Sequence, residues 1–302
     1  MIVLVTGATG YLGSHVVPAL QAQGHTVRAL VRGDGAGLPD GVTPVQGDVT
    51  DAGSLSDAFE GVEAVVHLVG IIDEHPSKGV TFEAIHVDGT RNVAHSARAA
   101  GVERFVHMSA NGADPDGASD YQTSKWRAEQ VVEGVGFGHL VLFRPSTLFG
   151  DPGPDHPEFA KRLWETLVKP FPVLPIFGDG AYQLQPIAVE TVARAIADAV
   201  TRDDLNGETI VAVGPEPIRY KEVLRRIALG GGIDPKPTVS IPMPLAKVGV
   251  YTVGKVGLLP ISPAQFEMLI AGNTGSAGRF AEQFGDAGPR FDADTLTYLQ
   301  SY

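Results

Sequence analysis

Short apolar runs alternate with amphipathic segments along the first half of the chain. The apolar runs are residues 2–5, 26–31, 42–46, 63–68, 104–108 and 139–143. Between them, apolar residues recur with helical spacing at 11–23, 54–59, 82–100 and 120–135. This alternation predicts six strands joined by right-handed helical crossovers, the arrangement of a parallel, doubly wound α/β sheet.

The pattern changes after residue 150. Residues 151–180 are dense in proline, glycine and aromatic residues, which predicts irregular structure on the substrate side of the molecule. A helix is expected at 187–200 and a strand at 208–213, so the chain returns to the sheet there. Shorter helices are expected at 220–229, 245–256 and 263–271, with glycine-rich loops at 230–232 and 272–278.

These patterns predict two domains. The sheet domain comprises residues 1–150 and 186–213. A small, discontinuous C-terminal lobe that caps the substrate comprises residues 151–185 and 214–302. The chain is long enough for both, since domains commonly contain about 100 to 200 residues.

Composition narrows the class of function. The net charge is −12 and no run of five or more basic residues occurs, which argues against a nucleic-acid partner. The absence of cysteine excludes disulfides, thiolate metal sites and a cysteine nucleophile, and it suits a reducing compartment. The nine histidines show no HExxH-type spacing, so we expect no metal site. With neither a signal peptide nor a long apolar stretch in the sequence, we expect a cytoplasmic protein.

The first thirteen residues, MIVLVTGATGYLG, carry the strongest local signal. A β-branched run is followed by glycines at 7, 10 and 13 and then by a helix. Glycine allows the backbone to approach a pyrophosphate, and the positive end of a helix favours an anion. The stretch predicts a phosphate-binding loop, although such glycine triplets also occur in ordinary turns.

Residues at the strand ends bear on the choice of cofactor. Where a dinucleotide fold places an acidic residue for the ribose 2′-OH, the second predicted strand ends in Val31 and Arg32. A guanidinium suits a 2′-phosphate, so Arg32 favours NADP(H) over NAD(H), unless it is an ordinary solvated residue. Asp48, after the third strand, is either an acceptor for the adenine amino group or a residue of a turn or helix cap. Gly70, after the fourth strand, permits close approach of a ligand.

Tyr121 and Lys125 lie four residues apart in a predicted helix, so both side chains share one face. An ammonium beside a phenol favours the phenolate and lowers the pKa of the tyrosine from about 10. Such a tyrosine can act as acid or base in hydride transfer. By itself the pair is common on solvated helices, and it gains meaning only together with the N-terminal glycine loop.

Together these segments resemble the extended branch of the short-chain dehydrogenase/reductases. The likeness rests on TGATGYLG at 6–13, GDVTD at 47–51, HLVG at 67–70, YQTSK at 121–125, RPSTLFG at 144–150 and PIAVETVARAIADAV at 186–200. Within that family the chain looks most similar to the atypical subgroup of the nucleotide-binding accessory subunit of respiratory complex I, through HTVRALVR at 25–32 and ISPAQFEMLIAGN at 261–273. The resemblance implies a Rossmann-type fold that binds NAD(P).

The resemblance also implies a role for each matching residue. Tyr121 would be the catalytic acid or base. Lys125 would both tune the tyrosine and donate a hydrogen bond to the cofactor ribose. The implied cofactor contacts are Gly7, Thr9, Gly10, Tyr11, Leu12, Gly13, Arg32, Asp48, Val49, Val69, Gly70, Lys125 and Pro145.

One position departs from the family pattern. The substrate-orienting serine or threonine of the family follows the fifth strand, and Ala110 occupies that place here. Ser109 lies one residue earlier and is kept as a candidate catalytic residue, with Asn111 as a substitute donor. Without a hydroxyl at position 110 a substrate carbonyl loses one polarising donor, so we expect slow or absent catalysis with retained cofactor binding.

Residues 244–259 predict an amphipathic helix with a basic side. Leu245, Val248, Thr252, Val256 and Leu259 fall on one side, and Lys247, Tyr251 and Lys255 on another. Such a helix suits a membrane surface or a protein partner, which would allow a peripheral position at the inner face of a membrane. The alternative is a small helix that packs on the C-terminal lobe with its lysines in water.

Three functions fit these observations. The leading hypothesis is an NADP(H)-binding oxidoreductase that transfers a hydride to or from an unknown small molecule with a carbonyl or quinone-like group. The second is a non-catalytic NADP(H)-binding accessory, assembly or redox-sensing protein. The third is a nucleotide-sugar epimerase or dehydratase, whose usual preference for NAD and an acidic strand end disagrees with Arg32. The sequence does not specify an oligomeric state.

Overall fold

A computed structural model describes residues 1–35, 37–234, 236–252 and 263–302. Its contacts divide the chain into two compact units. Unit 1 comprises Met1–Pro145 and Glu190–Val211, and unit 2 comprises Ser146–Val189 and Ala212–Tyr302. The domain boundaries expected from the sequence, after residues 150, 185 and 213, stay a prediction.

Unit 1 is built on a seven-stranded sheet with the order β11-β6-β5-β4-β1-β2-β3. The strands are β1 (Ile2–Thr6), β2 (Thr26–Val31), β3 (Thr43–Gln46), β4 (Ala64–His67), β5 (Arg104–Met108), β6 (His139–Pro145) and β11 (Thr209–Ala212). Every pair from β3 across to β6 is parallel. The predicted doubly wound α/β sheet is confirmed. The strand order reverses between β1 and β4, which is where such sheets bind ligands.

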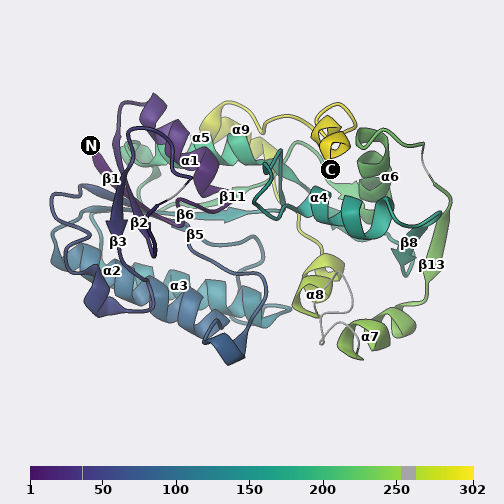
Figure 1. Cartoon of the computed structure of the whole chain (residues 1–302), viewed down its shortest axis with the longest axis horizontal. Coiled ribbons are helices and arrows are strands. Elements are labelled where there is room, and N and C mark those ends of the chain that lie inside the picture. Colours follow the sequence, from purple (N-terminus) through teal and green to yellow (C-terminus); the bar gives the residue numbers. More distant parts are fainter. Residues whose placement is uncertain (36, 235, 253–262) are drawn as a thin grey trace. The chain divides into compact units, whose positions relative to one another are not determined.

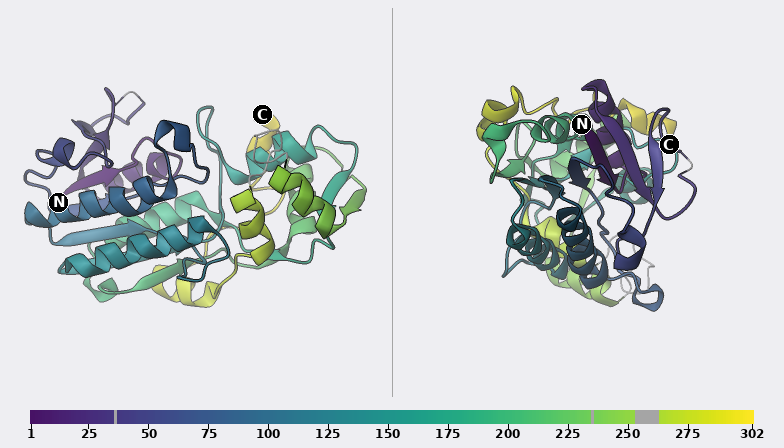
Figure 2. Two further views of the ribbon diagram at one scale, coloured as in Figure 1. Left: turned by 90° about the horizontal axis from the view of Figure 1, so that it is seen from below. Right: turned by 90° about the vertical axis from the view of Figure 1, so that its left-hand side faces the viewer.

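Helices cover both faces of this sheet (Figures 1 and 2). The helices are α1 (Gly13–Ala22) and α5 (Val189–Ala199) on one face, and α2 (Gly89–Ala99) and α3 (Asp120–Val135) on the other. Leu4, Val65 and Phe105 are fully buried and form a core with Val93 of α2 and Val132 of α3. Strands buried on both faces carry the continuous apolar runs seen in the sequence.

Two segments of unit 1 differ from expectation. The helix expected at 82–100 begins with a π-helical segment, Glu83–Asp88, and continues as α2. The helix expected at 54–59 is instead a 3₁₀ turn, Ala52–Leu55. It starts earlier because the Asp51 carboxylate accepts from the Gly53 N–H at 3.0 Å and so caps this turn.

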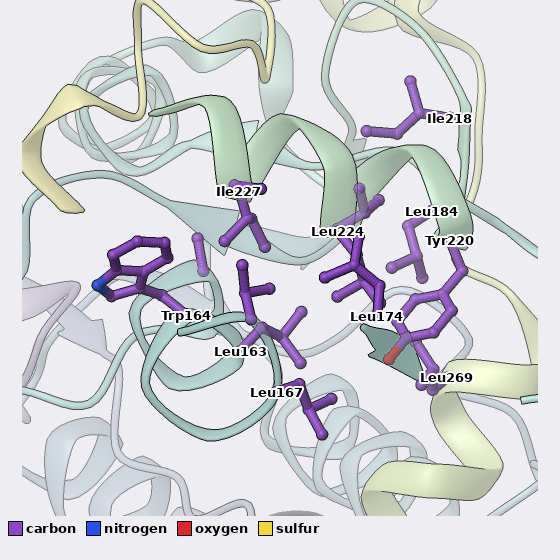
Figure 3. Packing of buried hydrophobic residues seen from close by; sticks show 14 of the residues in the cluster. Leu163, Trp164, Leu167, Leu174, Leu184, Ile218, Tyr220, Leu224, Ile227 and Leu269 are labelled. Carbon is purple, nitrogen blue, oxygen red and sulfur yellow. The ribbon is translucent and has the colours of Figure 1, made fainter. Parts of the chain in front are cut away.

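Unit 2 consists of paired short strands and helices. The strand pairs are β7 (Leu148–Phe149) with β10 (Ile187–Ala188), β9 (Gln183–Leu184) with β12 (Ile218–Arg219), and β8 (Leu174–Phe177) with β13 (Thr238–Ile241). The helices are α4 (Phe159–Leu163), α6 (Tyr220–Gly230), α7 (Met243–Thr252), α8 (Pro263–Ala271) and α9 (Ala277–Phe284), with a π-helical segment at Trp164–Val168 and a 3₁₀ segment at Thr297–Ser301. Figure 3 shows Leu224 and Ile227 of α6 packed toward Leu163 and Leu167.

The expectation of irregular structure at 151–180 is wrong in part. This segment contains α4, the Trp164–Val168 segment and β8. Buried Glu158 caps α4 by accepting from the Ala160 and Lys161 N–H groups at 2.8 and 2.7 Å. The partner of β8 is β13, more than sixty residues later, which a local pattern cannot reveal. Gly278, expected in a loop, lies in α9.

The predicted docking helix is only partly described. Ala246 and Val250 of α7 are buried, whereas Leu245 and Val248 are 65% and 63% exposed. Residues 253–259 of the predicted segment lie outside the described residues. Docking of a partner or membrane through 244–259 therefore stays a prediction.

No helix among the described residues is both long enough and apolar enough to cross a membrane.

Candidate functional site

The turn after β1 brings three stretches of backbone together. Gly7 adopts a positive φ of 74°, and its carbonyl accepts from the Gly10 N–H at 3.0 Å. A Cβ on Gly13 would lie 2.2 Å from the Gly7 oxygen, so α1 packs directly on the turn. A Cβ on Gly7 would lie 3.1 Å from the Val69 nitrogen, in the loop after β4. Glycine is therefore required at 7 and 13 for packing.

The start of α1 directly follows this turn. Thr9 is exposed, and Tyr11 and Leu12 are half-buried. The Ser14 hydroxyl donates to the Tyr11 carbonyl at 2.8 Å, which fixes the backbone where the helix begins. The first turn of α1 contains no acidic residue, so its positive end is not offset locally.

Arg32 and Asp48 follow neighbouring strands, β2 and β3. Arg32 is exposed. The Asp48 carboxylate accepts from the Thr50 N–H and hydroxyl at 2.9 and 2.8 Å, so Asp48 is a turn residue, and the cap of the next turn is Asp51. Burial would raise the pKa of Asp48, but the two Thr50 hydrogen bonds and the charge of Arg32 outweigh it and lower the pKa. Asp48 is therefore ionised and lies within the field of Arg32.

Three other predicted cofactor contacts lie around this edge of the sheet. The Val49 side chain is buried in the core, and its carbonyl accepts from the Asn92 side chain at 2.9 Å. Gly70 is exposed in the loop after β4. The Pro145 carbonyl, at the end of β6, accepts from the Asn111 N–H at 2.9 Å.

Lys125 is a buried lysine at the centre of the site. Its side chain is 3% exposed, and Nζ donates to the Met108 carbonyl at the end of β5. Burial lowers the pKa of Lys125 from 10.5 to about 8, although the charge of Glu129 opposes this. A Cβ on Gly70 would lie 3.8 Å from Nζ, so the lysine lies beneath the loop after β4.

Tyr121 corrects one expectation. Burial raises the pKa of Tyr121 to about 12, and the charge of Lys125 does not offset it. The ammonium is committed to the Met108 carbonyl instead. The expected lowering of the tyrosine pKa is therefore wrong for the protein alone, and Tyr121 holds its proton at neutral pH.

The segment after β5 has no hydroxyl at position 110, where the family pattern expects one. Ala110 is buried. Ser109 is also buried, and its hydroxyl has no hydrogen-bond partner among the described residues, while its N–H donates to the Phe143 carbonyl at 2.7 Å. The Ser109 hydroxyl is therefore not exposed to a substrate in this arrangement.

Comparison with known proteins assigns the chain to a family. The sequence model of the family described as "NAD dependent epimerase/dehydratase family" matches residues 3–214 of the chain. The chain belongs to this family. The resemblance expected from the sequence is thereby confirmed.

Two relatives show which proteins the chain is similar to. It is 28% identical over 226 residues to the mitochondrial NADH-ubiquinone oxidoreductase 40 kDa subunit of Neurospora crassa, a match that covers 72% of this chain and 57% of the relative. It is 30% identical over 256 residues to ceramide reductase of Caulobacter vibrioides, which covers 84% of this chain and 76% of the relative. The chain thus spans little more than half the length of the fungal subunit.

A solved structure has the same fold as this chain. DesIV, a dTDP-glucose 4,6-dehydratase from Streptomyces venezuelae with NAD and TYD bound, has a TM-score of 0.72 and 22% identity, covering 100% of this chain and 97% of that one. At this identity the likeness shows the fold alone.

Several buried residues around Lys125 escaped the sequence analysis. Glu129, one helical turn from Lys125, is 1% exposed and pairs with Arg144, whose Nε donates to it at 2.8 Å. Lys125 and Glu129 are four residues apart, so the sequence could have predicted that both lie on one face of the helix. His67 and His107 pair in register on β4 and β5 and stack at 5.5 Å.

These histidines are neutral. Burial and the charge of Lys125 lower the pKa of His67 to about 3 and that of His107 well below its usual value. His67 is held by the hydroxyls of Thr6 and Thr90 at 2.7 and 3.0 Å. Among the described residues no group of three or more histidine, aspartate or glutamate side chains could hold a metal ion.

Lys125 makes the stability of the protein depend on pH. Between pH 8 and 10.5 the unfolded chain binds more protons at Lys125 than the folded chain, so stability rises with pH over this window. We expect the unfolding free energy of wild type minus that of Lys125→Met to increase by up to about 3 kcal/mol across it, measured by urea titration. Exposed Lys78→Met is the matched control, because it removes a lysine and leaves the buried Lys125 in place. A constant difference for Lys125→Met would contradict the assignment.

Proposed function

We propose that the chain is an NADP(H)-dependent oxidoreductase that transfers a hydride to or from a small molecule with a carbonyl or quinone-like group. The observation that carries this proposal is that the Gly7 turn, the loop after β4 and Lys125 adjoin one another where the strand order reverses. The Gly7 turn lies against Val69, and the neighbouring Gly70 lies above the Lys125 ammonium. A dinucleotide that follows this path would have its phosphates at α1 and its reactive ring near Lys125 and Tyr121.

The residues present fit such a cofactor. A Cβ on Gly13 would clash with the turn and a Cβ on Gly7 would be crowded by the loop after β4, so the backbone is closely packed here. Backbone N–H groups at the start of α1 would contact the phosphates. Residues Thr9, Gly10, Tyr11 and Leu12 would form the pyrophosphate contact, and Lys125 would donate to a ribose hydroxyl. The bound cofactor would supply or accept the hydride.

Tyr121 would handle the proton. Because burial raises its pKa to about 12, the phenol is protonated at neutral pH and can donate to a carbonyl oxygen as that oxygen gains charge. Lys125, buried nearby on the same helix face, would stabilise the phenolate that results. The arrangement therefore favours the reductive direction at neutral pH.

Arg32 supports a preference for NADP(H). It is an exposed guanidinium directly after β2, where a 2′-phosphate would lie, and the ionised Asp48 is close enough to feel its charge. Asp48 would orient Arg32 and could also accept from the adenine amino group. NAD(H) binding at lower affinity is compatible with this site.

Titration with NADPH and NADH tests the cofactor preference. We expect Arg32→Ala to weaken NADPH binding by about ten- to a hundredfold, because one charged hydrogen-bond partner is lost, and to leave NADH binding unchanged. Arg98→Ala removes an exposed arginine that pairs with Glu103 at 2.7 Å, and it should change neither affinity. Equal affinities of the wild-type protein for NADPH and NADH would contradict the preference.

Replacement of Tyr121 tests the reaction. With NADPH and a panel of aldehydes, ketones and quinones, we expect Tyr121→Phe to lower kcat by about 10²- to 10⁴-fold with little change in NADPH affinity. Tyr251→Phe, at a 42% exposed tyrosine of α7, is the control and should be unchanged. The proposal fails if NADPH is not oxidised with any member of the panel and Tyr121→Phe alters nothing.

That negative outcome would support a second candidate, a non-catalytic NADP(H)-binding accessory or redox-sensing protein. Ala110 in the place of a hydroxyl favours it, and so does the buried Ser109, whose hydroxyl has no hydrogen-bond partner among the described residues, because neither can polarise a substrate carbonyl. The similarity to a subunit of NADH-ubiquinone oxidoreductase is compatible with such a role. A nucleotide-sugar epimerase or dehydratase is less well supported, since Arg32 stands where an acidic residue would be expected.

A further inference from the structure

His86 lies in the irregular part of the helix that follows the loop after β4. Residues Glu83–Asp88 form a π-helical segment, and His86 within it is 1% exposed. A π-helical turn widens a helix by one residue and often marks a functional position. Here it brings the imidazole between the loop after β4 and the first turn of α3.

The hydrogen bonds of His86 fix one tautomer. Nε2 lies 3.0 Å from the Ile71 backbone nitrogen, whose N–H can only donate, so Nε2 is the acceptor. The proton of the neutral ring is therefore on Nδ1, which lies 2.8 Å from the Ser124 hydroxyl. That hydroxyl in turn donates to the Tyr121 carbonyl at 2.7 Å. The donors and acceptors thus run in one direction, from Ile71 through His86 and Ser124 to Tyr121.

Ring contacts add to these bonds. The Tyr121 ring meets the His86 ring edge-on at 5.5 Å, and Phe82 stacks on His86 at 5.3 Å. Phe82 also meets Tyr121 edge-on at 5.8 Å. The side chain and the backbone of Tyr121 are therefore both held by groups that contact His86.

We propose that His86 is a positioning residue that holds the cofactor loop after β4 and the catalytic tyrosine as one unit. This inference rests on the proposed function of Tyr121 and of the loop Val69–Ile71. His86 acts through Ile71 and Ser124 and contacts no reacting atom in this arrangement.

The charges around the ring keep it in the required form. Lys125 on α3 faces it, neutral His67 lies on β4, and the backbone N–H of Ile71 points at Nε2. A second proton on Nε2 would meet both the Ile71 N–H and the positive field of Lys125. Burial and the charge of Lys125 accordingly lower the pKa of His86 to about 2, and the ring stays neutral over the working range of pH.

Two variants separate this role from simple packing. His86→Phe keeps an aromatic ring and loses both hydrogen bonds, whereas His86→Gln keeps an acceptor and a donor and loses the ring. His25→Phe is the matched control, because His25 is half-buried, lies outside the site, and neither of its ring nitrogens has a hydrogen-bond partner among the described residues. If His86 only filled space, its replacement by phenylalanine would give the same result as the control variant.

The experiment combines ¹⁵N NMR of the histidine rings, amide hydrogen exchange and NADPH titration on the full chain. We expect the Nδ1–H tautomer of His86 from pH 5 to 9. In His86→Phe, we expect protection of the Ile71 amide to fall by about tenfold and NADPH to bind about tenfold more weakly. His86→Gln should recover part of both effects, and His25→Phe should show neither.

An Nε2–H tautomer, or His86→Phe with unchanged Ile71 protection, would overturn the proposal. The tautomer and exchange measurements need no cofactor, so they test His86 even if NADPH does not bind. Failure of NADPH to bind the wild-type protein would instead count against the proposed function. If His86→Phe does not fold, the tautomer in the wild-type protein and the exchange in His86→Gln decide the matter.

Discussion

The site depends on the close approach of backbone to backbone at the carboxyl edge of the sheet. Gly13 at the start of α1 contacts the Gly7 carbonyl at a spacing that leaves no room for a Cβ. Gly7 has a positive φ and lies against the loop after β4 at Val69, where a Cβ would be crowded. This approach places the start of α1 next to the turn after β1 and holds the loop that covers Lys125 against the same turn. Parallel strands whose order reverses between β1 and β4 supply the edge itself.

The second requirement is a buried charge that is tolerated because its surroundings are polar. Lys125 donates to the Met108 carbonyl and has the Glu129–Arg144 pair one turn away on α3. The nearby histidines are neutral, so they add polar atoms without adding charge. Burial of this lysine disfavours its charged form, and the role proposed for its ammonium is to stabilise a phenolate at Tyr121.

Much of the fold could be predicted from the sequence because its signals are local. The bounds of β2, β5 and α3 agree with the expected residues, since apolar runs mark the strands, and Ser119 before α3 and Gly136 after it mark the helix ends. The partners of the site residues could not be predicted. Lys125 bonds to a carbonyl on another element, and His86 is joined to Ser124 only by the tertiary fold. For the same reason the pairing of β8 with β13 was missed, and the burial that raises the pKa of Tyr121 reversed the expected shift.

The most direct test of this account is NADPH affinity after placing a methyl group at the closest backbone contact. In Gly13→Ala the added Cβ would lie 2.2 Å from the Gly7 oxygen, so α1 must move away from the turn. Gly134→Ala is the matched control, because Gly134 lies in α3 with open space around its Cβ position. We expect Gly13→Ala to weaken NADPH binding by at least about tenfold and Gly134→Ala to bind as wild type. Wild-type affinity in a folded Gly13→Ala protein would contradict the claim that this turn holds the cofactor.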